Sequence, residues 1–262
     1  ARVYLENGKQ EQAVAVADKV LASTLRLGNY TASAQALSCA AEVYVRAGQK
    51  KKAVEAVAVA ALPFDDYFAD GRDKAKSAQV AMSLAVGYHA LGEAATYDRM
   101  LARSIDAYEA IAADDAEQVP TALGVLSSLL KLNRKDQFFA LSGALEEDVR
   151  DLIYFDASYL LVAERRCEGL GELQDKVSND GARAAVQSFD AGWLWRSGKK
   201  KAAKEVVKKA LELGRAWTPP KGVSKASLLV HLAFAPAEMG MKEEAMALLN
   251  KGRGLQANGG PE

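Results

Sequence analysis

A pattern of small and large residues with one glycine recurs along the chain. In its clearest copy the residues are Ala41, Tyr44, Gly48 and Ala53. Other copies lie at Tyr4, Gly8 and Ala13, at Ala191, Leu194, Gly198 and Ala203, and at Ala233, Pro236, Gly240 and Ala245. The glycines are 40 residues apart from position 8 to 48, 44 from 48 to 92, and 42 from 198 to 240. A repeat with this period is typical of stacked helical hairpins, each of which buries its apolar face on the next.

Composition favours helices throughout. The chain contains only three isoleucines and five threonines, and alanine and leucine are its commonest residues. β-branched residues favour strands, whereas the dominant residues are good helix formers. We therefore predict an all-α solenoid that forms one helical-repeat domain over residues 1–252, followed by a flexible C-terminal tail at 253–262.

Apolar spacing and the glycines predict a truncated first hairpin and six further hairpins. The helices of these six hairpins are predicted at 31–47 and 50–62, 74–91 and 93–111, 116–132 and 135–145, 148–166 and 172–177, 182–196 and 199–213, and 224–239 and 242–250. Asn133 stands where the other turns have glycine. Pro236 falls inside a helix, where it removes a hydrogen bond and bends the axis.

Charge and hydropathy give no sign of a nucleic-acid or membrane partner. The 34 basic and 34 acidic residues balance to a net charge of zero, so no general attraction to phosphates is expected. A basic cluster at 196–209 is interpreted as a solvated helix face, because no stacking aromatics accompany it. The longest uncharged stretch, 77–92, contains 16 residues, fewer than the ~18 to 20 that a membrane span needs. These features predict a soluble protein.

The sequence contains no recognisable catalytic, metal or cofactor motif. Cys39 and Cys167 lie far apart, as do His89 and His231, and neither pair has the spacing of a zinc site. The glycines occupy helix ends, and they form neither a phosphate-binding loop nor a dinucleotide fingerprint. We expect no cofactor, no metal and no enzymatic activity, and the cysteines leave the cellular compartment open.

The pattern Ala41-x-x-Tyr44-x-x-x-Gly48-x-x-x-x-Ala53 resembles the tetratricopeptide repeat, which places small and aromatic residues at these intervals. The period is longer than the ~34 residues of that family, and the early tryptophan is missing. The resemblance implies a right-handed superhelix of about seven antiparallel helix pairs. It also implies that the first helix of each pair lines a concave face that binds a protein or peptide.

The resemblance places candidate partner-binding residues on that concave face. They are Glu42, Arg46, Gln79, Met82, His89, Phe189, Trp195, Arg196, His231 and Phe234, with Gln35, Ser38, Val86 and Ser188 beside them. The lysines and asparagines that clamp a C-terminal carboxylate in some family members are missing, so we expect recognition of an internal segment or a folded surface. In the alternative interpretation, Phe189 and Trp195 fill the core between hairpins.

Two functions fit these features. The first is a protein-interaction scaffold that binds its partner on the concave face. The second is the sensory or regulatory arm of a larger protein, which binds a small ligand and changes curvature. The second is suggested by Pro236 and by the start of the chain inside a repeat, from which we expect either a processed form or further repeats or domains before Ala1.

Overall fold

The computed structural model describes residues 1–24, 29–64, 72–163, 170–219 and 225–257, and every secondary-structure element in these ranges is a helix. The chain divides into two compact units, Ala1–Lys135 and Asp136–Glu262. The sequence predicts a single helical-repeat domain over residues 1–252, and this stays a prediction. The helical pattern runs through the boundary without a change in composition, so nothing in the sequence marks it.

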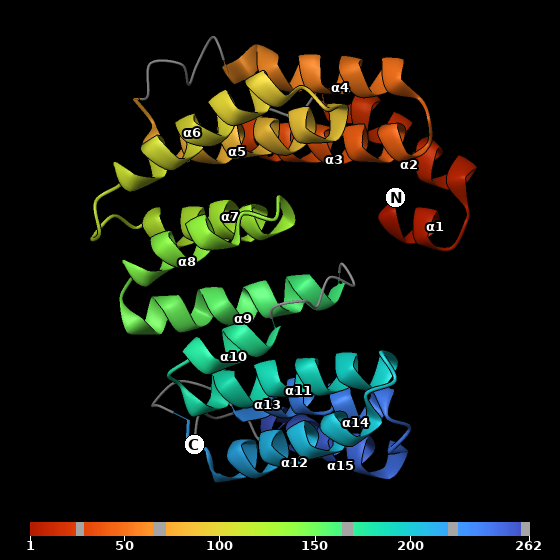
Figure 1. The fold of residues 1–262 in the computed structure, drawn as a ribbon, viewed down its shortest axis with the longest axis vertical. Coiled ribbons are helices and arrows are strands. Elements are labelled where there is room, and N and C mark those ends of the chain that lie inside the picture. Colours follow the sequence, from red (N-terminus) through yellow and green to blue (C-terminus); the bar gives the residue numbers. More distant parts are fainter. Residues whose placement is uncertain (25–28, 65–71, 164–169, 220–224, 258–262) are drawn as a thin grey trace. The chain divides into compact units, whose positions relative to one another are not determined.

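Unit 1 is built from helix pairs joined by short turns (Figure 1). Helix α3 pairs with α4, and α5 pairs with α6, while α3 also packs on α5 and α5 on α7. Small residues such as Ala41, Ala53 and Ala60 are fully or almost fully buried and let the helices approach closely. The helices are α1 (Arg2–Glu6), α2 (Gln10–Thr24), α3 (Tyr30–Arg46), α4 (Lys50–Pro63), α5 (Lys74–Leu91), α6 (Ala94–Glu109) and α7 (Gln118–Lys131).

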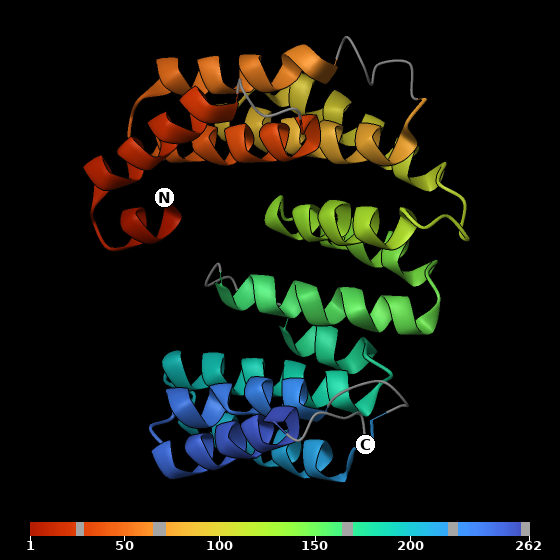
Figure 2. The same ribbon diagram turned by 180° about the vertical axis from the view of Figure 1, so that it is seen from behind.

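Unit 2 continues the same construction, seen from behind in Figure 2. Helix α11 packs against α9 on one side and against α13 on the other, and it pairs with α12. The helices are α8 (Lys135–Gly143), α9 (Glu147–Ala163), α10 (Leu170–Lys176), α11 (Asp180–Arg196), α12 (Lys200–Ala216), α13 (Lys225–Leu232), α14 (Phe234–Glu238) and α15 (Lys242–Ala257). The all-α fold of packed helix pairs that the sequence predicted is confirmed within both units.

The C-terminal boundary differs from the prediction. Helix α15 continues to Ala257, so 253–257 are helical although a tail was predicted from 253. At Gly252 an added Cβ atom would lie 3.2 Å from the carbonyl oxygen of Ala226 and 3.6 Å from the Cβ atom of Leu229, so α15 lies close to α13 there. The sequence indicates a frayed helix end at Gly252, but in the structure this residue lies inside α15, where two helices pack closely. The remaining residues of the predicted tail, 258–262, lie outside the described part of the chain.

The turns of the hairpins share one backbone conformation. Gly8, Gly48, Gly92, Gly198 and Gly240 have φ between 70° and 80°, and Asn133 has φ 59°. Glycine adopts this left-handed conformation at little cost, and asparagine tolerates it better than most residues. The prediction that Asn133 replaces the turn glycine is therefore confirmed.

Gly48 and Gly124 allow the cost of this turn conformation to be measured separately from packing. A methyl group at either position meets no atom within 4 Å, but only Gly48 has a positive φ. We expect Gly48→Ala to lower the free energy of unfolding by about 1–2 kcal/mol and Gly124→Ala, inside α7, to raise it by about 1 kcal/mol. Urea unfolding of both variants checks the pair. Equal effects of the two substitutions would show that the positive φ of Gly48 does not determine the cost of placing a side chain there.

Pro236 interrupts the penultimate helix, as the sequence predicted. Helix α13 ends at Leu232, and α14, which contains Pro236, begins at Phe234. The hydroxyl of Ser188 on α11 lies 3.0 Å from the carbonyl oxygen of His231 and 3.3 Å from that of Leu232, and it accepts a bond from the Ala235 amide. Because proline has no amide hydrogen to offer Leu232, the neighbouring helix supplies the missing donor.

Candidate functional site

A groove of ≈ 320 Å³ lies in unit 1 across the first helices of three successive pairs, and we call it the unit 1 groove. Helix α3 contributes one wall, α5 the middle and α7 the other wall. Its lining residues are Thr31, Gln35, Ser38, Cys39, Gln79, Met82, Ser83, Val86, Pro120, Gly124, Ser128 and Lys131. A single ionic side chain, that of Lys131, belongs to this set, so the groove suits a ligand recognised mainly through neutral hydrogen bonds.

Some polar side chains of the groove form hydrogen bonds with neighbouring residues, and one has no hydrogen-bond partner among the described residues. The Gln79 amide donates to the Thr121 hydroxyl at 3.1 Å, and the Ser83 hydroxyl donates to the Gln79 carbonyl at 2.9 Å. Ser38 is 1% exposed, and its hydroxyl has no hydrogen-bond partner among the described residues. A buried hydroxyl without a partner costs free energy. This hydroxyl is enclosed between α3 and α5, where a Cβ atom at Gly87 would lie 3.1 Å from its oxygen.

Gly124 leaves an open position in the wall formed by α7. A Cβ atom built there meets nothing within 4 Å. Ser128 lies one turn later, and its hydroxyl is turned back onto the Gly124 carbonyl at 2.8 Å. The backbone of α7 can therefore be approached closely by a bound chain, as at other glycines where a ligand contacts backbone.

The structure brings some of the residues predicted for this face into the groove. Gln79 and Met82 line it, together with Gln35, Ser38 and Val86. Glu42 and Arg46, later on α3, are not among its lining residues, nor is His89, whose ring packs against Tyr97 at 5.1 Å between centroids. The groove thus includes the predicted residues of α5 but not those near the C-terminal ends of α3 and α5, and the binding role of all of them stays a prediction.

A second pocket, of ≈ 480 Å³, lies in unit 2, and we call it the Trp217 pocket. It also lies on the first helices of successive pairs, α9, α11 and α13, with Trp217 added from the segment after α12. Its lining residues are Asp148, Asp151, Leu152, Phe155, Asn179, Gly181, Ala182, Ala185, Trp217, Ser227, Leu228 and His231. Aromatic and aliphatic side chains form most of its wall.

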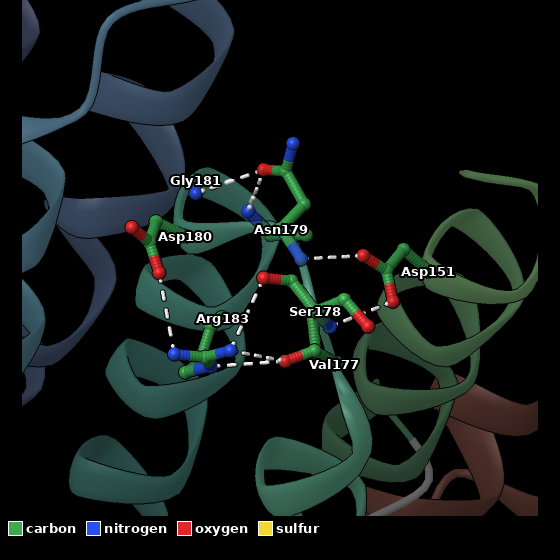
Figure 3. A network of polar contacts seen from close by, with 8 residues as sticks. Asp151, Val177, Ser178, Asn179, Asp180, Gly181 and Arg183 are labelled. Atoms are coloured by element: carbon green, nitrogen blue, oxygen red, sulfur yellow. Dashed lines mark hydrogen bonds and ion pairs between the residues drawn. The ribbon is translucent and has the colours of Figure 1, made fainter. Parts of the chain in front are cut away.

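A polar network fixes the wall of the Trp217 pocket where α10 gives way to α11 (Figure 3). Asp151, which is 4% exposed, accepts hydrogen bonds from the amides of Ser178 at 3.0 Å and Asn179 at 2.5 Å. The Asn179 side chain accepts bonds from the Gly181 and Ala182 amides and so caps α11. Helix α9 thereby holds the N-terminus of α11.

The network continues through Arg183 on α11. Its guanidinium donates to the carbonyl oxygens of Val177 and Ser178 and lies 3.2 Å from the Asp180 carboxylate. These bonds satisfy carbonyl groups at the end of α10, as Figure 3 shows. The charge of Arg183 is therefore directed at its own backbone and not at the pocket.

Trp217 is positioned by Gly181. A Cβ atom at Gly181 would lie 2.6 Å from the indole ring, so the ring rests directly on the α11 backbone. The Lys225 ammonium donates to the carbonyl oxygens of Arg215 and Trp217 and holds the segment that carries the ring. The tryptophan is thus a fixed wall of the pocket.

The remaining predicted residues belong to an aromatic cluster and its rim. Phe189 is 3% exposed and packs against His231 and Phe234, with centroids 5.8 Å and 5.4 Å away. Its burial favours the interpretation that it fills the core. Arg196 forms two hydrogen bonds with Glu238, and the Lys200 ammonium lies over the Trp195 ring at 5.1 Å. Of the predicted residues in unit 2, only His231 lines the Trp217 pocket.

Burial shifts the pKa values of two groups in unit 2. It lowers the pKa of His231 below its usual value, and it raises the pKa of the Asp190 carboxyl, a shift that nearby Lys199 partly opposes. Asp190 is 9% exposed and is not among the residues of the Trp217 pocket.

Within the described ranges, no group of three His, Cys, Asp or Glu side chains is placed to hold a metal ion. None of the helices in these ranges combines the length and the hydropathy that a membrane-spanning helix requires.

Three parts of these pockets were not predicted from the sequence. The α7 wall carries Gly124, Ser128 and Lys131 at intervals of four and three residues on an otherwise leucine-rich helix, and this spacing could have revealed a polar face. Leu152 and Phe155 on α9 were missed because they look like ordinary core residues. Trp217 was missed because it lies outside any helical period.

No protein-family model and no curated protein matches the chain. Structural similarity is found to BtubC (BKLC) from P. vanneervenii, with 13% identity over 96% of this chain and 93% of that chain and a TM-score of 0.37. Similarity is also found to a candidate kinesin light chain from Podosopora anserina with nearly identical TPR-like repeats, and to a single-substitution variant of it. Both have 14% identity, cover 88% of this chain and 98% of theirs, and have TM-scores of 0.33 and 0.32. These likenesses are distant and do not assign a function.

Proposed function

We propose that the protein is an interaction scaffold whose unit 1 groove binds an extended segment of a partner protein. The observation that carries this proposal is the groove itself, which crosses α3, α5 and α7 and is lined by neutral side chains apart from Lys131. Peptide backbone supplies both donors and acceptors at regular intervals. A segment lying across α3, α5 and α7 could meet the exposed Gln35 on one side and the open position at Gly124 on the other.

The neutral lining defines the kind of segment expected. Glutamine, serine and threonine side chains can hydrogen-bond an extended backbone without demanding a particular charge. Met82 and Val86, which are 2% and 8% exposed, give the groove an apolar floor on which a small apolar side chain can rest. Lys131 at one wall favours an acidic residue or a backbone carbonyl beside it.

The test blocks the groove without disturbing the fold. Peptides selected from a random phage-displayed library on the full chain are measured by fluorescence anisotropy against Gly124→Trp and Gly254→Trp. Both glycines lie in helices, and an added Cβ meets nothing within 4 Å at either, but only Gly124 lines the groove. We expect Gly124→Trp to weaken binding at least tenfold, or about 1.4 kcal/mol, and Gly254→Trp to leave it unchanged.

A second measurement locates the bound peptide. Cys39 lines the groove, and a Cys167→Ser background leaves it as the single cysteine. Bound peptide should slow the alkylation of Cys39 in this background. The proposal is rejected if the selection yields no specific peptide, or if selected peptides bind Gly124→Trp as tightly as the unmodified protein and leave Cys39 unprotected.

A further inference from the structure

We propose that the Trp217 pocket binds a lysine or arginine side chain of an extended segment of a partner protein. Unit 2 contains the whole pocket, so this inference does not depend on the unit 1 groove. It is based on the charges that line the pocket, on the aromatic walls, and on exposed apolar residues of α9.

The charged side chains known to line the pocket are acidic. Asp148 and Asp151 line it, and among the described residues no lysine or arginine does so. Asp151 already accepts two backbone hydrogen bonds, whereas Asp148 is exposed and forms no ion pair with any described residue. His231 also faces the pocket, and burial lowers its pKa, so it adds no positive charge at neutral pH. A bound cation would supply the charge that the pocket lacks.

Two basic side chains whose hydrogen bonds hold the walls of the pocket do not fill this role. The Arg183 guanidinium donates to the carbonyl oxygens of Val177 and Ser178, and the Lys225 ammonium donates to those of Arg215 and Trp217. Neither residue lines the pocket. The chain therefore has basic groups beside the pocket but uses them to hold its walls.

The walls match the stem of such a side chain. Phe155, Trp217 and Leu228 provide apolar surface, and the indole ring is fixed against the backbone of Gly181. Lysine and arginine combine an apolar stem with a charged head, and their cations are attracted to aromatic faces. An anionic ligand would meet two carboxylates, and a neutral apolar ligand would desolvate Asp148 without giving it a partner.

The surroundings favour a side chain on a segment over a small free cation. Leu152 is 46% exposed and Tyr159 is 57% exposed, and they lie two turns apart on α9, so they share one face. These two side chains offer contact area to the residues that flank the inserted cation.

The probe is a capped peptide with one arginine between alanines, compared with the same peptide carrying citrulline, which has nearly the same shape but no charge. Binding is followed by the indole NH resonance of Trp217 in the full chain, assigned with a Trp217→Phe sample. We expect the arginine peptide to bind about tenfold more tightly than the citrulline peptide. Asp148→Asn should abolish this difference, whereas Glu205→Gln, the same charge change on α12 outside the pocket, should preserve it.

Three results would overturn the proposal. The first is equal affinity for the arginine and citrulline peptides, and the second is an arginine preference that survives in Asp148→Asn. The third is binding of n-butylguanidinium as tight as that of the arginine peptide, because it would identify a site for a free cation and not for a partner segment. Leu152→Ala, which shortens the apolar wall, should weaken both peptides equally.

Discussion

Replacing Tyr44 by alanine is expected to lower the free energy of unfolding of unit 1 by about 3–5 kcal/mol. Tyr44 is 0% exposed and is the large residue of the clearest repeat copy. Its hydroxyl donates to the Asp18 carboxylate at 2.8 Å, and the Lys52 ammonium donates to the same oxygen at 2.7 Å. The side chain thus ties α3 to α2 and α4, and its removal leaves a cavity where three helices meet.

The matched control, Tyr44→Phe, keeps the ring and removes only the hydroxyl. Burial and the Asp18 carboxylate raise the pKa of Tyr44, so at neutral pH the hydroxyl is a donor, and the hydrogen bonds from Lys52 and Tyr44 lower the pKa of Asp18. Because the Asp18 side chain is 44% exposed, water can replace the lost donor, and we expect a cost of about 1 kcal/mol.

Urea unfolding of both variants distinguishes packing from hydrogen bonding in this contact. The cost of Tyr44→Ala should be several times that of Tyr44→Phe. Equal costs would mean that the hydrogen bond to Asp18, and not the buried ring, stabilises the contact of the three helices. In that case the large residue of the repeat pattern would have been assigned the wrong role.

The repeat pattern was sufficient to predict most of the fold. Helix α5 was predicted over 74–91 and is observed at Lys74–Leu91, and the turns at Gly48, Gly92 and Asn133 follow from local backbone preference. Such features depend on neighbouring residues alone, so they can be read from the sequence. The boundary after Lys135 could not be predicted, because it depends on which helices contact each other more than on any local signal.

Fewer of the residues that line the two pockets could be predicted from the sequence. Gln79 and Met82 were found because the first helix of a pair faces the groove, a property of the hairpin itself. Phe189 and His231 have similar helical positions, yet the first is core and the second lines a pocket. Trp217 reaches its pocket only because Gly181, which is 36 residues earlier (217 − 181), leaves room for its ring. Contacts of this kind depend on tertiary packing.

Asp151→Ala is expected to lower the free energy of unfolding of unit 2 by about 3 kcal/mol, because each buried amide left without an acceptor costs about 1–3 kcal/mol. The two amides concerned are those of Ser178 and Asn179. Asp148→Ala is the matched control, since Asp148 lies one turn earlier on α9 but is exposed. It should change stability by less than about 0.5 kcal/mol.

The measurement combines urea unfolding with hydrogen exchange at the Ser178 and Asn179 amides. In Asp151→Ala both amides should exchange faster, and so should those of Gly181 and Ala182, because Asn179 would no longer be held where it caps α11. Unchanged exchange in Asp151→Ala, or an equal loss of stability in Asp148→Ala, would contradict this role. The wall of the Trp217 pocket would then be held by packing between α9 and α11, and the carboxylate of Asp151 would be available to a ligand in the same way as that of Asp148.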